Sequence, residues 1–150
     1  MLVSFRALAV LAIGAILVGC AGRGGADSGS PAADGALFAR LGGMDGVRAL
    51  VDDLASRLAA DEQIQRFFVK TDFRRFKARL VVQVCALSGG PCRYTGRTMA
   101  EVHRGRRIRS AHFEAFMEDV AASLTAVRLS ARDRVEFLKR LRAMKPEIVR

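Results

Sequence analysis

The sequence predicts an all-α protein, and three observations support that prediction. Apolar residues recur at spacings of three and four almost everywhere beyond residue 36. No alternating apolar–polar run of strand length stands out. Glycine, proline and capping residues separate the apolar stretches where helices are expected to begin and end. The chain has 150 residues, about the length of one domain, and we place that domain at residues 37–150.

Residues 1–19 have the pattern of an export signal. Arg6 precedes an apolar run, Ala7–Val18, which as a helix would span about 18 Å, short of the ~30 Å hydrocarbon core. A basic start, a short apolar centre and a small-residue exit are typical of secretory signals. The exit, Leu17-Val18-Gly19-Cys20, is similar to a bacterial lipobox. We therefore expect cleavage before Cys20 and lipid on that cysteine; an ordinary signal peptide is the alternative.

Residues 20–36 are rich in glycine, serine and alanine, which predicts a flexible tether. The expected location is outside the cytoplasm, with the protein lipid-anchored to the membrane, at its periplasmic face. In a Gram-negative source, that membrane would be the outer one.

Four amphipathic helices are expected in the domain. Gly42 and Gly43 precede the first, and Thr71 or Asp72 caps the second, which ends at residues 88–91. Ser110 is the expected cap of the third, and Ser130-x-x-Asp133 has the pattern of a capping box for the last. Their apolar stripes are Val47, Leu50, Val51, Leu54 and Leu58; Phe73, Phe76, Leu80, Val84 and Leu87; Phe113, Phe116, Met117, Val120, Leu124 and Val127; and Val135, Leu138 and Leu141.

Residues 89–109 are poor in apolar side chains, and long loops of this kind are often functional. Met99, Val102 and His103 share one face of a short helix, which Gly105 is placed to end. A single imidazole on an apolar wall is what haem iron needs as an axial ligand. A structural histidine, in the core or at the surface, is the alternative.

Several short motifs, taken in order, are similar to those of the group 1 truncated haemoglobins. They are Leu41-Gly42-Gly43, Asp61, Phe67-Phe68-x-x-Thr71, Gly89-Gly90-Pro91, Tyr94-Thr95-Gly96, Met99, His103-x-Gly105-x-x-Ile108 and Phe113. The resemblance implies a two-over-two helical sandwich around haem b, with His103 as the proximal iron ligand and Phe68 packed on the haem face. It also implies a reversibly bound diatomic gas (dioxygen, nitric oxide or carbon monoxide) at an iron that can be pentacoordinate.

The resemblance extends to the walls of the haem site. Arg79 is the expected partner of a haem propionate, with Lys77 and Arg106 as weaker candidates. The remaining cofactor-binding positions are expected to be Phe76, Leu80, Val84, Met99, Val102, Ile108, Phe113 and Phe116.

The expected distal pocket departs from the family pattern. Ala55 stands where many relatives carry a tyrosine that hydrogen-bonds dioxygen, Leu80 where glutamine is common, and Phe76 at the gate. Gln83 lies three residues beyond Leu80, off the usual ligand-binding position. Losing a neutral donor costs about 1 kcal/mol, so we expect weak or short-lived dioxygen binding and poor discrimination against carbon monoxide or nitric oxide.

Cysteine usage predicts a disulfide between Cys85 and Cys92, because Cys20 is assigned to lipid and an even pair remains in an oxidising compartment. A metal site formed by Cys85, Cys92 and His103 is a weaker alternative, since it lacks a convincing fourth ligand. The second histidine, His112, is expected to be partly exposed at a helix start, with a role as an adventitious second haem ligand as the alternative.

Charge and composition limit the classes of binding partner that we expect. The net charge is +10, but 51% of residues are apolar, which argues against a disordered basic tail. An exported protein rarely meets nucleic acid, so the basic clusters are assigned to haem propionates and anionic lipid. We therefore expect an oxygen-transport, nitric oxide or redox role that depends on an unidentified reductase. A haem enzyme, either a nitric oxide dioxygenase or peroxidase-like, and a haem-free helical interaction module are the alternatives.

Overall fold

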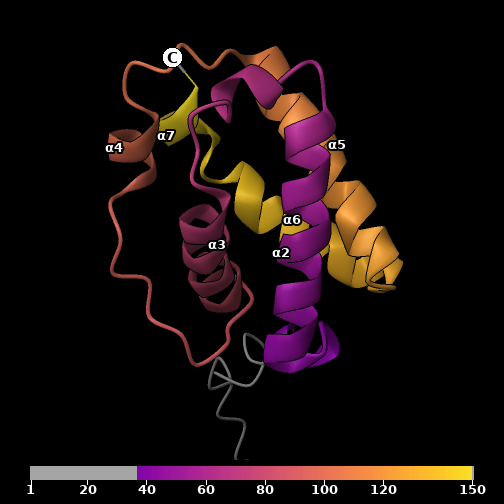
Figure 1. Cartoon of the computed structure of the whole chain (residues 1–150). Coiled ribbons are helices and arrows are strands. Elements are labelled where there is room, and N and C mark those ends of the chain that lie inside the picture. The colour runs from indigo at the N-terminus through magenta and orange to yellow at the C-terminus, as the bar shows by residue number, and fades with distance from the viewer. Residues whose placement is uncertain (1–36, 150) are drawn as a thin grey trace, which may run out of the picture.

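The computed structural model describes residues 37–149, and every regular element in that range is helical (Figure 1). The predicted all-α class is therefore confirmed for this part of the chain. The expected signal peptide, Cys20 and the tether lie outside the described residues. A helical segment at residues 37–40 comes first. The elements that follow are α2 (Gly43–Ala60), the 3₁₀ helix η1 (Gln65–Phe67), α3 (Phe73–Leu87), α4 (Met99–His103), α5 (Ser110–Ala126), α6 (Ala131–Arg142) and α7 (Lys145–Ile148).

The helices begin largely where their capping residues predict. Gly42 precedes α2 with a φ of 95°, a left-handed conformation that glycine adopts without strain. Asp72 caps α3 by accepting from the backbone N–H of Arg75 at 3.1 Å. Ser130 caps α6 by accepting from the backbone N–H of Asp133 at 3.2 Å. The residue that precedes α5 is Arg109 rather than the expected Ser110, which is the first helical residue.

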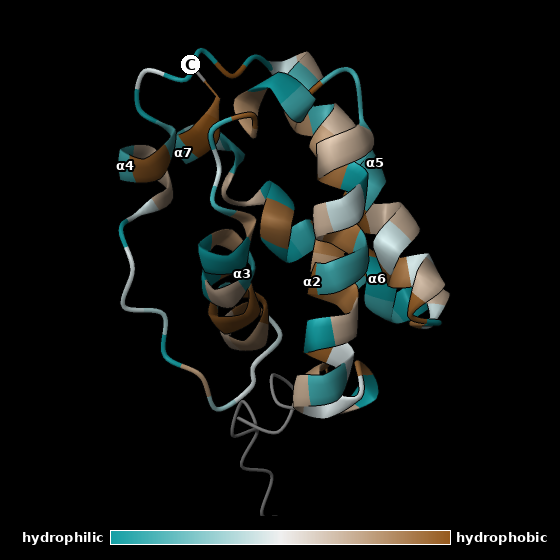
Figure 2. Cartoon of the chain, viewed as in Figure 1, coloured by the Kyte–Doolittle hydropathy of each residue, from teal (hydrophilic) through white to brown (hydrophobic). Residues whose placement is uncertain are grey.

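The core is centred on α2, which packs against α3 on one side and α5 on another. Buried residues of α2 and α5 supply most of it, and Figure 2 shows that the longer helices each carry hydrophobic and hydrophilic residues. The prediction for the last helix is partly wrong. Val135 is 68% exposed, whereas Phe137 is 1% exposed and joins the core. The buried face of α6 is thus set by Phe137 and Asp133, not by Val135.

A side-chain ion pair at the start of α6 and a disulfide near the end of α3 join segments that are separate in the sequence. Asp133 at the start of α6 accepts from Arg40 Nε at 2.9 Å, which ties residues 37–40 to the second half of the chain. At the other end of α3, Cys85 is joined to Cys92 by a disulfide with a Cα–Cα distance of 5.7 Å. No helix among residues 37–149 combines the length and the apolar character needed to cross a bilayer.

Candidate functional site

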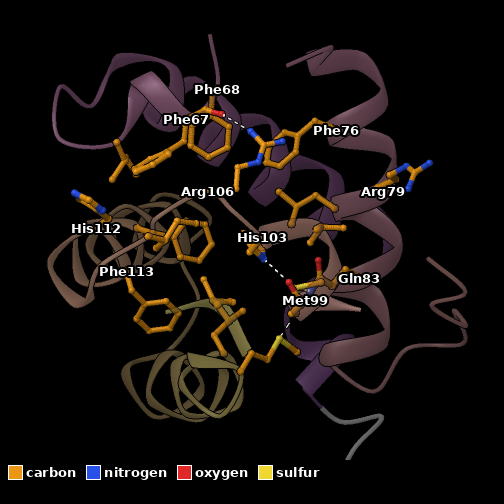
Figure 3. A pocket seen from close by; sticks show the side chains of 18 of the residues that line it. Phe67, Phe68, Phe76, Arg79, Gln83, Met99, His103, Arg106, His112 and Phe113 are labelled. Atoms are coloured by element: carbon orange, nitrogen blue, oxygen red, sulfur yellow. Dashed lines mark hydrogen bonds between the residues drawn. The ribbon is translucent and has the colours of Figure 1, made fainter. Parts of the chain in front are cut away.

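A cavity of about 310 Å³ is bounded by α3, α4, α5 and the C-terminal residues (Figure 3). Volumes of ~300–1,000 Å³ are usual for small-molecule and cofactor sites. Its wall is largely apolar and includes a cluster of phenylalanines. The cavity explains why α3 has few buried residues despite a clear apolar stripe. Of the predicted stripe, only Val84 is buried. Phe76 and Leu80 pack partly against the core and also line the cavity.

Aromatic rings form one wall of the cavity. The ring of Phe68, just after η1, lies 5.6 Å from the ring of Phe76 in an edge-on arrangement. Phe73 lies 5.9 Å from Phe76 and 6.3 Å from Phe68, measured between ring centroids. Such edge-to-face contacts are more favourable than stacked sandwiches. They give this wall a fixed shape, and Leu80 and Val84 continue it along α3.

Helix α4, which carries His103, is only five residues long and depends on its caps. Thr98 Oγ1 accepts from the backbone N–H of Glu101 at 3.2 Å, and Glu101 Oε2 accepts from the backbone N–H of Thr98 at 2.8 Å. The backbone N–H of Thr98 and its hydroxyl, which donates to the same oxygen at 3.0 Å, lower the pKa of Glu101. Gly105, with a φ of 74°, follows the end of the helix as expected. The Thr-x-x-Glu pattern was visible in the sequence and would have located the start of the helix.

The ring of His103 is oriented by a backbone hydrogen bond. Its Nδ1 lies 2.8 Å from the carbonyl oxygen of Met99. Because a carbonyl can only accept, Nδ1 carries the proton and Nε2 is left with its lone pair. Burial lowers the pKa of His103, although the bond to Met99 opposes that effect. The arrangement therefore favours a neutral imidazole, the form that binds metals.

The opposite wall is formed by the loop after α4, by α5 and by the chain end. Ile108, Phe113 and Phe116 line it together with Val102. Three residues that sequence reasoning did not assign also take part, namely Leu141, Met144 and Ile148. Helix α7 packs against α4, so the C-terminus closes the cavity behind the histidine. Leu141 belonged to the predicted stripe of α6, but nothing in the pattern of residues 144–148 signalled a cavity wall.

The structure gathers the predicted haem-site residues around this one cavity, with two exceptions, Ala55 and Lys77. Ala55 is buried in α2 and does not appear in the lining. The lining does include the predicted Phe68, Phe76, Arg79, Leu80, Val84, Met99, Val102, His103, Ile108, Phe113 and Phe116.

The polar side chains considered for the haem site lie in different places relative to the cavity. Arg79 and Arg106 both border the cavity. Lys77 does not, because its Nζ bonds Asp52 Oδ1 at 2.8 Å. Gln83 also lines the cavity, where its Nε2 lies 3.3 Å from the sulfur of Met99. His112 is half-exposed near the start of α5, as expected, and also reaches the lining.

The alternative metal site receives no support. The sulfurs of Cys85 and Cys92 are bonded to each other. Within residues 37–149 no three side chains of histidine, cysteine, aspartate or glutamate come together as metal ligands. The chemistry that the cavity does offer is one free imidazole nitrogen between apolar walls, with guanidinium groups at the edge. These groups suit a flat apolar macrocycle that carries a metal and anionic substituents.

Comparisons with known proteins point to the same kind of site. The family model described as bacterial-like globin matches residues 36–150. The group 1 truncated haemoglobin GlbN of Mycolicibacterium paratuberculosis is 35% identical over 112 residues, covering 75% of this chain and 82% of that protein. The truncated haemoglobin of Tetrahymena pyriformis, solved in its Fe(III) form, matches with a TM-score of 0.73 and 27% identity over 75% of this chain and 97% of that one. The 2/2 haemoglobin of Synechococcus, solved with covalently attached haem, has a TM-score of 0.72 at 25% identity, over 75% and 97% of the two chains.

Proposed function

This chain belongs to the bacterial-like globin family, and on that premise we propose that it holds haem b through His103 and reversibly binds a diatomic gas. The observation that supports this most directly is the state of His103. Its Nδ1 is committed to Met99, its Nε2 keeps a lone pair, and its ring borders a cavity of about 310 Å³. No other imidazole in the described chain has a free lone pair and apolar walls on both sides.

Each part of the cavity has a role in this proposal. Haem supplies an iron that binds diatomic gases. If haem occupies the cavity, the rings of Phe68, Phe76, Phe113 and Phe116, which line it, would pack against the macrocycle and exclude water. The guanidinium group of Arg79 borders the cavity and is placed to neutralise a propionate. The hydrogen bond from His103 to Met99 sets the orientation of the imidazole and raises its basicity as a ligand.

The side chains along α3 should affect which diatomic gas binds with the highest affinity. The side chains of Phe76, Leu80 and Val84 face the cavity and offer no hydrogen-bond donor. Gln83, one turn further along, directs its amide at the sulfur of Met99. We infer that dioxygen is released quickly and that carbon monoxide and nitric oxide compete effectively, because dioxygen depends most on a donor. This inference rests on the haem assignment.

Visible spectroscopy tests the haem assignment. The purified protein, reconstituted with haem, should show a Soret band that shifts on reduction and on addition of carbon monoxide. The chain has two histidines, which provides a matched control. His103→Ala should abolish the low-spin and pentacoordinate signatures of a histidine-ligated haem, whereas His112→Ala should keep the spectrum. A spectrum that is unchanged in His103→Ala would overturn the assignment.

We also propose that the protein is exported and anchored by lipid on Cys20. The support is the sequence of residues 1–20, with its basic start, short apolar run and lipobox-like exit. Cells expressing the full chain and fed labelled palmitate should incorporate label into the protein, and Cys20→Ala should prevent it. Label retained by the alanine variant would contradict the anchor.

Catalytic turnover is less well supported than gas binding. Peroxide cleavage requires a positioned acid–base group on the ligand side of the haem. Along α3, the wall presents Phe76, Leu80, Gln83 and Val84, none of which is an acid–base group near neutral pH. Steady-state peroxidase assays should therefore show little activity above free haem.

A further inference from the structure

A second, solvent-open hollow lies next to the cavity, between η1 and the turn that leads into α5. Its charge is unusual. Four of the six lining residues are arginines, and no carboxylate is among them: the lining is Arg66, Phe67, Gly105, Arg106, Arg107 and Arg109. Within residues 37–149, none of these arginines makes an ion pair with an acidic side chain, whereas Arg40, Arg57 and Lys77 elsewhere in the fold do.

The arginines are held in place by neutral contacts. Arg106 Nη1 donates to the carbonyl oxygen of Phe67 at 3.4 Å. The guanidinium of Arg66 lies over the ring of Phe67, 5.0 Å from its centroid. Helix α5, 17 residues long, begins directly beside the hollow at Ser110, so the positive end of its dipole adds to the field of the arginines. All of these features favour a bound anion.

His112 supplies an independent indication that an acceptor belongs here. The backbone N–H of Arg109 donates to Nδ1 at 3.1 Å, and Arg66 Nη2 lies 2.8 Å from Nε2. Both neighbours are donors, yet a neutral imidazole has only one nitrogen that can accept. The other ring nitrogen therefore meets a donor with its own proton. The charged groups around the ring are Arg66 from η1 and Arg109 before α5, and the remaining close neighbour is the ring of Phe67 at 5.0 Å. An anion that accepted from the Arg66 guanidinium in place of Nε2 would remove this conflict.

We propose that this hollow, formed by Arg66, Arg106, Arg107 and Arg109, binds a phosphate group that carries at least two negative charges. His112 adjoins the hollow through its contact with Arg66. Four guanidinium groups carry more positive charge than one bound carboxylate would neutralise. Each planar guanidinium can also donate two parallel hydrogen bonds to two phosphate oxygens. The phosphate can belong to a free di- or polyphosphate or to the headgroup of an anionic lipid. The chemistry of recognition is the same in both cases.

Two arginines provide a matched pair of variants. Arg107 and Arg128 are both exposed and both have left-handed backbones, with φ of 54° and 59°. Replacing either by glycine removes one charge and the same backbone strain, so the two variants should change stability similarly. Only Arg107 borders the hollow. A difference in anion binding between Arg107→Gly and Arg128→Gly therefore reports the site and not net charge or folding.

The experiment is a titration of the haem-loaded protein with pyrophosphate at low and at physiological salt. Calorimetry measures the affinity, and the imidazole signals in the NMR spectrum measure the pKa of His112. Burial and the adjacent Arg66 lower that pKa in the free protein. Bound pyrophosphate should raise it, because the anion stabilises the imidazolium. Arg107→Gly should weaken binding roughly three- to fivefold, and Arg128→Gly should leave it unchanged.

A parallel arm uses vesicles of phosphatidylglycerol mixed with phosphatidylcholine, and vesicles of phosphatidylcholine alone. A raised pKa of His112 with phosphatidylglycerol vesicles but not with pyrophosphate would identify a lipid headgroup as the source. The proposal would be overturned if no probe changed the pKa of His112, or if both glycine variants weakened binding equally. It would also be overturned if pyrophosphate bound only the haem-free protein. That last result would assign the arginines to the haem propionates.

Discussion

Leu80 is the position where the α3 wall can acquire a hydrogen-bond donor with little disturbance of the core. Its side chain lines the cavity and is only half-buried. Leu80→Gln adds an amide of similar length at that position. A neutral hydrogen bond is worth about 1 kcal/mol, so dioxygen should leave roughly fivefold more slowly, with a smaller effect on carbon monoxide. Flash photolysis and stopped-flow mixing measure both rates.

The matched control for that change lies on the same helix. Ala78 is exposed on α3 and does not border the cavity, so Ala78→Gln adds the same amide without placing it near a ligand. Equal rates in the two variants, or a slow dioxygen release in the unmodified protein, would contradict the idea that the wall lacks an effective donor.

Single residues also mark where sequence reasoning succeeds and where it fails. His103 and Phe68 were assigned by a resemblance of motifs, and the fold brings both to one cavity. Ala55 was assigned by alignment alone, and its small side chain stays in the core. The mutual contact of His112 and Arg66 joins residues 46 positions apart. No local pattern encodes such a pairing, because it depends on how η1 meets the start of α5.

At the scale of elements, the ion pair between Arg40 and Asp133 at the start of α6 should stabilise the fold in a pH-dependent way. Asp133 accepts from Arg40 and from Ser130 Oγ at 2.9 and 2.7 Å, and these bonds lower its pKa below the ordinary value. A carboxyl with a lowered pKa in the folded state stabilises the protein above its unfolded pKa, which is about 3.9 for aspartate. That stabilisation is lost as the pH falls below about 4 towards the folded pKa.

Thermal unfolding as a function of pH tests this ion pair. Asp133→Asn should lower the melting temperature at neutral pH and reduce the loss of stability as the pH falls below about 4. Asp45→Asn is the control, because Asp45 lies in the first turn of α2, is 97% exposed and pairs only with the nearby Arg48. If the melting temperature of both variants falls with pH as it does in the unmodified protein, Asp133 is not the cause of the acid sensitivity.

The disulfide is the second link between elements. Cys85 is fully buried near the end of α3, and Cys92 lies seven residues further on in the loop that leads to α4. The chain-entropy model predicts that closing a loop of this size stabilises the fold by about 2.5 kcal/mol. Urea unfolding with and without reductant should show that difference in the free energy of unfolding.

A double variant separates this effect from other actions of the reductant. Cys85→Ala with Cys92→Ala should unfold at the same urea concentration whether or not reductant is present. Thiol titration of the folded, oxidised protein should find no reactive group from Cys85 or Cys92. Two such thiols would show that the bond is not formed.

The helices themselves were predictable because their signals are local. The apolar stripes of α2, α3 and α5 follow the 3.6-residue period, and glycine marks the start of α2 and aspartate that of α3. The face of α6 was misjudged because its apolar residues, Val135, Phe137, Leu138 and Leu141, fit two registers. The contact with α3 and α5 selects the register that buries Phe137. Local patterns do not contain that choice.

For the molecule as a whole, the cavity divides the fold into two parts of different stability. Helices α2 and α5 form a buried core with each other and with α3. Helix α4 has no buried residue and packs mainly on α7, which is also short and has none. A helix of five residues is not stable alone in water. The half of the molecule that carries His103 is therefore expected to depend on what fills the cavity.

Hydrogen exchange with and without haem tests this dependence. In the haem-loaded protein, the hydrogen-bonded amides of Glu101 and Val102 in α4, and of Glu147 and Val149 at α7, should be protected, because packing on the cofactor and ligation of His103 hold α4 in place. After haem extraction these amides should exchange at least ten times faster, while those of α2 and α5 should change much less. The same loss should appear in His103→Ala at subsaturating haem but not in His112→Ala. A uniform loss of protection across all helices would instead show that the cofactor stabilises the whole fold as one cooperative unit.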